Sequence, residues 1–129
     1  GGRQLDHGLG SIAVLPEVVA AVAGRAQVWV DGGFMRGTDV VKAIALGAQT
    51  VGLGRLACLG LAAAGPAGLV RTLQLLEEEI AVTLALLGVR SFAELTPRHV
   101  TTAMPVRVPS AFSAFPLLEE YPLPADLRD

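Results

Sequence analysis

The chain has 129 residues, of which 52% are hydrophobic and 17% are charged, and its formal net charge is −2 at pH 7. Disordered chains are poor in apolar residues and rich in charge, so this composition excludes disorder. The chain has no basic run, which excludes the electrostatic footprint of a nucleic-acid-binding protein. The mean hydropathy of +0.54 is high for a short chain, which needs many polar groups to cover its surface. We therefore expect this chain to be part of a larger protein.

The cysteine and hydropathy patterns indicate the cellular setting. The single cysteine, Cys58, cannot form an internal disulfide, and its apolar neighbours predict a buried thiol in a reducing cytoplasm. The longest uncharged run covers residues 56–70 and is interrupted by Gly65 and Pro66. A helical membrane span needs about 20 residues. The sequence therefore predicts a cytoplasmic protein without a membrane span.

The first half of the chain alternates predicted helices and strands. After a glycine-rich loop over 1–10, apolar residues recur at helical spacing over 12–23, with Ser11 as the expected N-cap and Gly24 as the stop. The next predicted elements are a strand over 27–30, a helix over 38–46 and a strand over 50–53. Strands that alternate with helices predict a parallel sheet. Because two strands do not make a sheet with two covered faces, we expect the missing strands from an upstream segment or another chain.

The second half is predicted to be helical and then extended. A helix is expected over 67–87, after Pro66, and Ser91 with Glu94 predicts a capping box for a short helix that ends at Leu95. Five of the eight prolines follow Thr101, and such density blocks helices and central strands. We therefore divide the chain into residues 1–100 and an extended tail, 101–129, that packs along a surface. A solvated linker is the alternative interpretation of the tail.

Glycines and arginines follow both predicted strands. The sequence DGGFMRG, residues 31–37, comes after the first strand, and LGR, residues 53–55, comes after the second. Neighbouring parallel strands end at the same edge, so both loops are expected to face one pocket. Glycine lets backbone N–H groups approach an anion, and a helix N-terminus adds a favourable dipole. Arg36 and Arg55 could add charge-assisted hydrogen bonds. The pattern predicts a phosphate site, although tight turns alone would also explain the glycines.

Three motifs in order resemble a known family. The opening GGRQLD, with DGGFMRGTDVVKAIALGA and VGLGR behind it, resembles the FMN-dependent L-2-hydroxy-acid oxidases and dehydrogenases over roughly residues 1–95. That family includes glycolate oxidase, lactate oxidase, mandelate dehydrogenase and flavocytochrome b2. Its fold is a TIM (β/α)8 barrel, an α/β fold that typically needs about 250 residues. The resemblance implies that this chain is the C-terminal quarter of the barrel, strands 7 and 8 with flanking helices, incomplete on its own.

The resemblance also implies roles for particular residues. The FMN phosphate would be surrounded by Asp31, Gly32, Gly33, Phe34, Met35, Arg36, Gly54 and Arg55. Arg3 matches the family arginine that pairs with the substrate carboxylate, a role suited to a planar guanidinium. The family usually has arginine where Met35 stands, so phosphate binding is expected to depend on Arg55 and backbone N–H groups, with Arg36 as a candidate substitute.

No catalytic residue is expected within the chain, and no metal site. The catalytic base of the family is a histidine that precedes GGRQLD, so it would lie immediately before Gly1. Neither His7 nor His99 replaces it. The consecutive glutamates 77–79 point in different directions and predict a solvated helix face. Trp29 alternates with its strand neighbours and is predicted to pack against a barrel helix.

The implied activity is the FMN-dependent oxidation of an L-2-hydroxy acid to the 2-oxo acid by the complete protein, with this chain alone inactive. The implied partners are the small hydroxy-acid substrate, the N-terminal remainder of the barrel and, by resemblance, further copies in a homotetramer. One alternative is another FMN barrel such as an IMP dehydrogenase-like enzyme, although GGRQLD argues against it. A second alternative is a non-catalytic half-barrel that associates through its exposed apolar edges.

Overall fold

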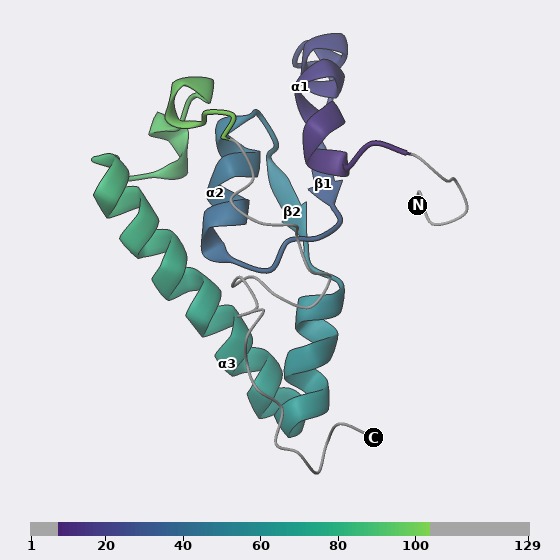
Figure 1. Ribbon diagram of the computed structural model, residues 1–129, viewed down its shortest axis with the longest axis vertical. Coiled ribbons are helices and arrows are strands. Elements are labelled where there is room, and N and C mark those ends of the chain that lie inside the picture. The colour runs from purple at the N-terminus through teal and green to yellow at the C-terminus, as the bar shows by residue number, and fades with distance from the viewer. Residues whose placement is uncertain (1–7, 104–129) are drawn as a thin grey trace, which may run out of the picture.

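The computed structural model describes residues 8–103. The elements in chain order are α1 (Ser11–Val22), β1 (Trp29–Asp31), α2 (Gly37–Ala45), β2 (Thr50–Gly52), α3 (Arg55–Leu87) and the 3-10 turns η2 (Phe92–Glu94) and η3 (Pro97–His99). The predicted alternation of helices and strands is confirmed (Figure 1). Arg3, His7 and nearly all of the proposed tail lie outside the described residues.

The two strands form a parallel pair joined by α2. Val30 on β1 faces Val51 on β2, and Asp31 faces Gly52. Each strand has three residues, fewer than predicted, and β1 begins two residues later than expected. Immediately before β1, the N–H of Val28 donates to Oε1 of Gln49 at 2.6 Å. A side-chain oxygen thus accepts the hydrogen bond at a position that precedes the first paired residues, Trp29 and Thr50.

The first core lies between the sheet and α1 with α2. Its buried members are Leu15, Val28, Val30, Phe34, Ala43 and Ala48. Val28 and Val30 therefore face the helices, whereas Trp29 between them points to the other side and is 69% exposed. No described element covers that side. The prediction that Trp29 packs against a helix is wrong for the described residues, because the alternation of a strand gives the helix-facing side to the valines.

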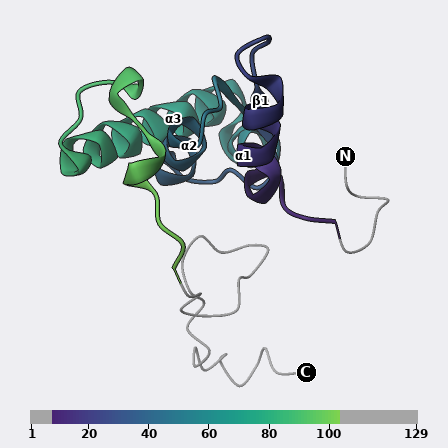
Figure 2. The same ribbon diagram turned by 90° about the horizontal axis from the view of Figure 1, so that it is seen from above.

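The second core lies between α2 and α3. Val41, Ala45 and Leu95 are buried there, with Ile80 and Leu84 of α3 packed against them. The helix α2 is thus enclosed on two sides, by the sheet and by α3. Figure 2 shows α1 and the segment that carries η2 and η3 on opposite sides of α2. The loop that enters α2 therefore lies between the first core, to which its Phe34 belongs, and the second core, between α2 and α3.

The long helix α3 consists of two segments that fold back on each other (Figure 1). Ala64 (φ −152°, ψ 32°) and Gly65 (φ 58°, ψ −147°) interrupt it, where the sequence predicted a break. The segments touch closely, because a Cβ on Gly68 would overlap the carbonyl oxygen of Gly60. The first segment, 55–63, was missed by the sequence prediction, since its small apolar residues show no amphipathic period. By length and composition alone, Arg55–Leu87 would suffice to cross a membrane, but it is not one continuous helix.

Three local predictions are corrected by the structure. Ser11 is the first residue of α1 rather than its N-cap, which is Gly10. Ser91 makes no side-chain capping bond. The capping interaction forms one turn later, where the Thr96 N–H donates to Nδ1 of His99 at 3.0 Å. Cys58 is exposed, not buried, because no described element covers its side of α3.

Candidate functional site

The loops that follow β1 and β2 meet in a pocket, here named the strand-end pocket. It has a volume of about 180 Å³ and is lined by Asp31, Gly32, Gly33, Phe34, Met35, Gly54 and Arg55. The parallel register sets Asp31 beside Gly52, so both loops leave the sheet at the same edge. The structure thus brings together seven of the eight residues predicted for the phosphate, and Arg36 is the exception.

The loop after β1 is shaped by two glycines and one anchor. Gly32 and Gly33 have φ of 104° and 83°, values that strain other residues. A Cβ added to Gly33 would meet no heavy atom within 4 Å, so its backbone borders open space. Phe34 is 6% exposed and belongs to the first core. The loop therefore presents its backbone to the pocket while one side chain holds it to the protein.

The second wall is the beginning of α3. Gly54 is the N-cap and makes no side-chain capping bond, so the first backbone N–H groups of the helix are not satisfied by a cap. A helix N-terminus also carries partial positive charge. The side chain of Arg55 is exposed and has no ion-pair partner within residues 8–103. An open glycine backbone, a helix N-terminus and an available guanidinium fit a phosphate dianion.

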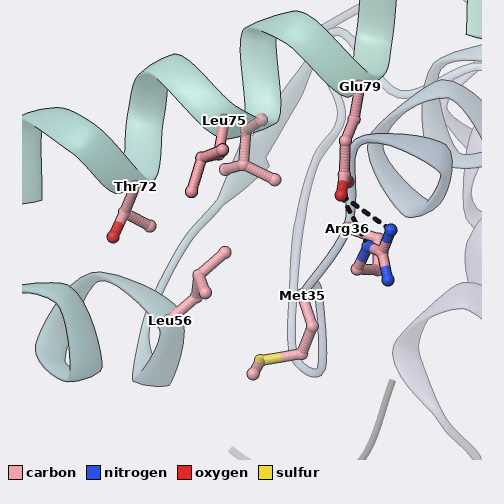
Figure 3. Close-up of a pocket in the computed structure, with 7 residues that line it drawn as sticks. Met35, Arg36, Leu56, Thr72, Leu75 and Glu79 are labelled. Carbon is pink, nitrogen blue, oxygen red and sulfur yellow. Dashed lines mark hydrogen bonds and ion pairs between the residues drawn. The ribbon is translucent and has the colours of Figure 1, made fainter. Parts of the chain in front are cut away.

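Arg36 does not line this pocket, and its side chain lies against Glu79 of α3 (Figure 3). Its Nε donates to Oε1 of Glu79 at 2.8 Å, and its Nη2 lies 2.7 Å from the same oxygen. The other carboxylate oxygen of Glu79 accepts from the Gly37 N–H at 2.7 Å. The hydrogen bond with Glu79 raises the pKa of Arg36 above its ordinary value, although partial burial opposes this effect. As a phosphate ligand, Arg36 would have to give up this ion pair.

The expectation of a solvated glutamate face is correct for two residues and wrong for the third. Glu77 and Glu78 are exposed, and Glu78 pairs with Arg71 at 3.0 Å. Glu79 is half-buried at the contact between α3 and the loop before α2. Its position three residues after the buried Leu76 marks the edge of the packed helix face, a pattern that could have identified it.

Asp39 is a second residue that sequence reasoning missed. Its Oδ2 accepts from the N–H groups of Met35 and Arg36 at 3.2 and 3.1 Å. The available clue was the position of Asp39, the third residue of α2, where a carboxylate can reach back to the helix start. The turn that enters α2 is thus held by two carboxylates, those of Asp39 and Glu79.

A second pocket, here named the hairpin pocket, adjoins the first. It has a volume of about 280 Å³ and is lined by Met35, Arg36, Leu56, Thr72, Leu75, Leu76 and Glu79. Figure 3 shows Leu56 and Thr72 on the two segments of α3, with Met35 approaching from the loop. Met35 lines both pockets and therefore forms the wall between them. Within residues 8–103, no group of three or more His, Cys, Asp or Glu side chains is arranged to hold a metal.

Comparisons with known proteins agree with the resemblance read from the motifs. A peroxisomal (S)-2-hydroxy-acid oxidase of Oryza sativa subsp. japonica is 53% identical over 102 residues, which are 79% of this chain and 28% of that protein. An L-lactate oxidase of a Nostoc species is 52% identical over 88 residues, 68% of this chain and 24% of that protein. This chain thus spans about a quarter of the length of these relatives.

The structural comparison gives the same result. The structure of (S)-mandelate dehydrogenase, described as a monotopic membrane protein, matches with a TM-score of 0.71 and 44% identity, over 77% of this chain and 26% of that one. The family model described as FMN-dependent dehydrogenase matches residues 1–102. The predicted family and its FMN dependence are confirmed, and the chain belongs to the FMN-dependent dehydrogenase family.

Proposed function

We propose that the complete protein oxidises an L-2-hydroxy acid to the 2-oxo acid with FMN, and that this chain supplies the phosphate end of the FMN site. The observation that carries the proposal is the strand-end pocket, where two glycine loops, a helix N-terminus and Arg55 converge in a chain of this family. Bound FMN would supply the hydride-accepting chemistry of the reaction. The protein contributes binding and orientation.

The proposed placement in the barrel is that β1 and β2 are strands 7 and 8. Two features support it. The sheet is covered by helices on one side, whereas the side of Trp29 is exposed, as expected for strands whose other face completes a barrel interior. The pocket lies at the carboxyl ends of the strands, the edge at which barrel enzymes place their sites. The N-terminal remainder of the protein would supply the other strands.

The proposed phosphate ligands are the backbone of Gly32, Gly33 and Gly54 with the guanidinium of Arg55. Asp31, Phe34 and Met35 complete the wall of the pocket. Backbone N–H groups and an arginine offer short charge-assisted bonds to phosphate oxygens. Arg36 serves this site through its ion pair with Glu79 rather than through the phosphate.

Two further roles and the cellular setting remain predictions. Arg3, outside the described residues, would bind the substrate carboxylate with its planar guanidinium. The general base would be a histidine immediately before Gly1. A cytoplasmic homotetramer is proposed from the cysteine content and the family resemblance, whereas the rice relative is named as peroxisomal. Fractionation of the source cells with a marker enzyme for each compartment would decide the location.

The test is flavin binding by the intact protein, including whatever coding sequence precedes Gly1. The purified protein is expected to show visible flavin absorbance and to reduce its flavin when L-lactate, glycolate or L-mandelate is added. Arg55→Gln is expected to weaken FMN binding by about tenfold to a hundredfold, because a charge-assisted hydrogen bond contributes about 1.5–3 kcal/mol.

The matched control is Arg90→Gln, which removes the same charge from an exposed arginine beyond the end of α3. This variant should retain FMN like the wild type. A flavin-free wild type that does not take up added FMN would contradict the proposed function. Equal FMN binding by the two variants would contradict the role of Arg55.

A further inference from the structure

Glu79 connects the loop after β1 to α3 through both of its carboxylate oxygens. Oε1 accepts from Nε of Arg36 at 2.8 Å, and Oε2 accepts from the N–H of Gly37 at 2.7 Å. One carboxylate thus holds the side chain of Arg36, the last residue before α2, and the backbone of Gly37, the first residue of α2. Charge-assisted bonds are shorter and stronger than neutral ones, so the loop is held firmly where it enters α2.

This contact leaves little space for adjustment. A Cβ added to Gly37 would lie 2.6 Å from Cβ of Glu79, 2.7 Å from the nitrogen of Ile80 and 2.9 Å from the carbonyl oxygen of Leu76. The backbone at the start of α2, where the loop ends, therefore lies against the backbone of α3. In a close-packed contact a displacement on one side moves the other, so a change at Glu79 is expected to shift the loop.

The same loop forms one wall of the strand-end pocket, and α3 begins at the other. Met35, next to Arg36, lines the pocket, and so do Gly54 and Arg55 at the start of α3. The bridge through Glu79 joins the later segment of α3 to the loop (Figure 3). The spacing of the two walls therefore depends on this bridge as well as on the pairing of β1 with β2.

We propose that Glu79 is a positioning residue for the FMN phosphate. Through Arg36 and Gly37 it sets where the loop that carries Gly33 stands relative to Arg55. The inference rests on the proposed function and adds to it a residue that does not line the strand-end pocket. Glu79 thus acts on the anion through the loop.

The direction in which FMN affinity changes when Glu79 loses its charge distinguishes a positioning role from direct electrostatic repulsion. A glutamate near a bound phosphate repels it, so removal of its charge alone would strengthen FMN binding. Loss of positioning weakens binding, because displaced N–H groups no longer reach phosphate oxygens at hydrogen-bond distance. Glu79→Gln preserves the size of the side chain and removes its charge. The two effects then act in opposite directions on the same measured affinity.

The experiment titrates intact apoprotein with FMN and with riboflavin, which lacks the phosphate. Glu79→Gln is expected to weaken FMN binding about tenfold, equivalent to about 1.4 kcal/mol, and to leave riboflavin binding unchanged. Arg36→Gln should weaken FMN binding similarly. The double variant should be no weaker than either single one, because the two side chains act as one unit.

Glu78→Gln is the matched control. Glu78 is the preceding residue, carries the same charge and is exposed in an ion pair with Arg71, so its loss should leave both affinities unchanged. Unchanged or tighter FMN binding by Glu79→Gln would overturn the inference. An equal loss of FMN and riboflavin binding would also overturn it, since that pattern indicates general destabilisation. A wild type that binds neither flavin would overturn the proposed function itself, and the inference with it.

Discussion

The guanidinium of Arg36 and the carboxylate of Glu79 lie 2.7 Å apart, although 43 residues separate them in the chain. Their ion pair closes the contact between α3 and the loop before α2, beside the strand-end pocket. The hydrogen bond from Arg36 lowers the pKa of Glu79 below its ordinary value of 4.5, partial burial opposes this effect, and the N–H of Gly37 adds to it. The stability of the fold is therefore linked to the ionisation of Glu79.

The lowered pKa predicts how stability changes with pH. A carboxylate whose pKa is lower in the folded state stabilises the protein above its unfolded pKa, and this contribution is lost as the pH falls through the folded pKa. We expect the difference in unfolding free energy between the wild type and Glu79→Gln to be constant near neutral pH and to shrink below about 4.5. Urea unfolding of both proteins across this range measures the difference. A difference that is independent of pH would contradict the linkage.

Gly37→Ala is expected to destabilise the protein. The added Cβ would lie within 3 Å of three atoms of α3, two of them backbone atoms that cannot turn away. Forced overpacking typically costs about 1–3 kcal/mol, which urea unfolding should detect. Gly10→Ala is the comparison variant, because a Cβ there meets nothing within 4 Å and Gly10 has a φ of −63°, so its expected cost is limited to the replacement of a glycine N-cap by alanine, less than about 1 kcal/mol. Equal stability of the two variants would show that the contact with α3 is loose.

Met35→Arg is expected to strengthen FMN binding. Met35 lines the strand-end pocket, and Arg36 is already bound to Glu79, so a guanidinium at position 35 would be a second cation beside Arg55. We expect an affinity gain of about tenfold at low salt, from a new charge-assisted bond, and a smaller gain at high salt because ions screen the attraction. Met35→Gln, with similar length and no charge, is the control. An equal gain in both variants would argue against an electrostatic cause.

Much of the fold follows from local patterns. The alternation of apolar residues, the glycines after each strand and the break before Pro66 each depend on residues close together in the chain, and the structure contains all three features. The grouping of Asp31 with Arg55 also follows from the sequence, because successive parallel strands end at one edge. The sequence does not predict the helical segment 55–63, because this segment has no amphipathic period. Its packing against the second segment of α3, at Gly68, specifies it instead.

The choice between the two arginines of the loops was made only by tertiary structure. The sequence presents Arg36 and Arg55 as similar cations at glycine turns, and both were predicted to surround the phosphate. Packing of α2 on α3 brings Glu79 to Arg36 and leaves Arg55 at the pocket. The sequence alone thus determined the family, the parallel strand pair and the two loops, because these depend on short-range patterns. Which acidic side chain pairs with each arginine depends on contacts between segments that are distant in the chain. Only the packing of the folded protein brings these segments together.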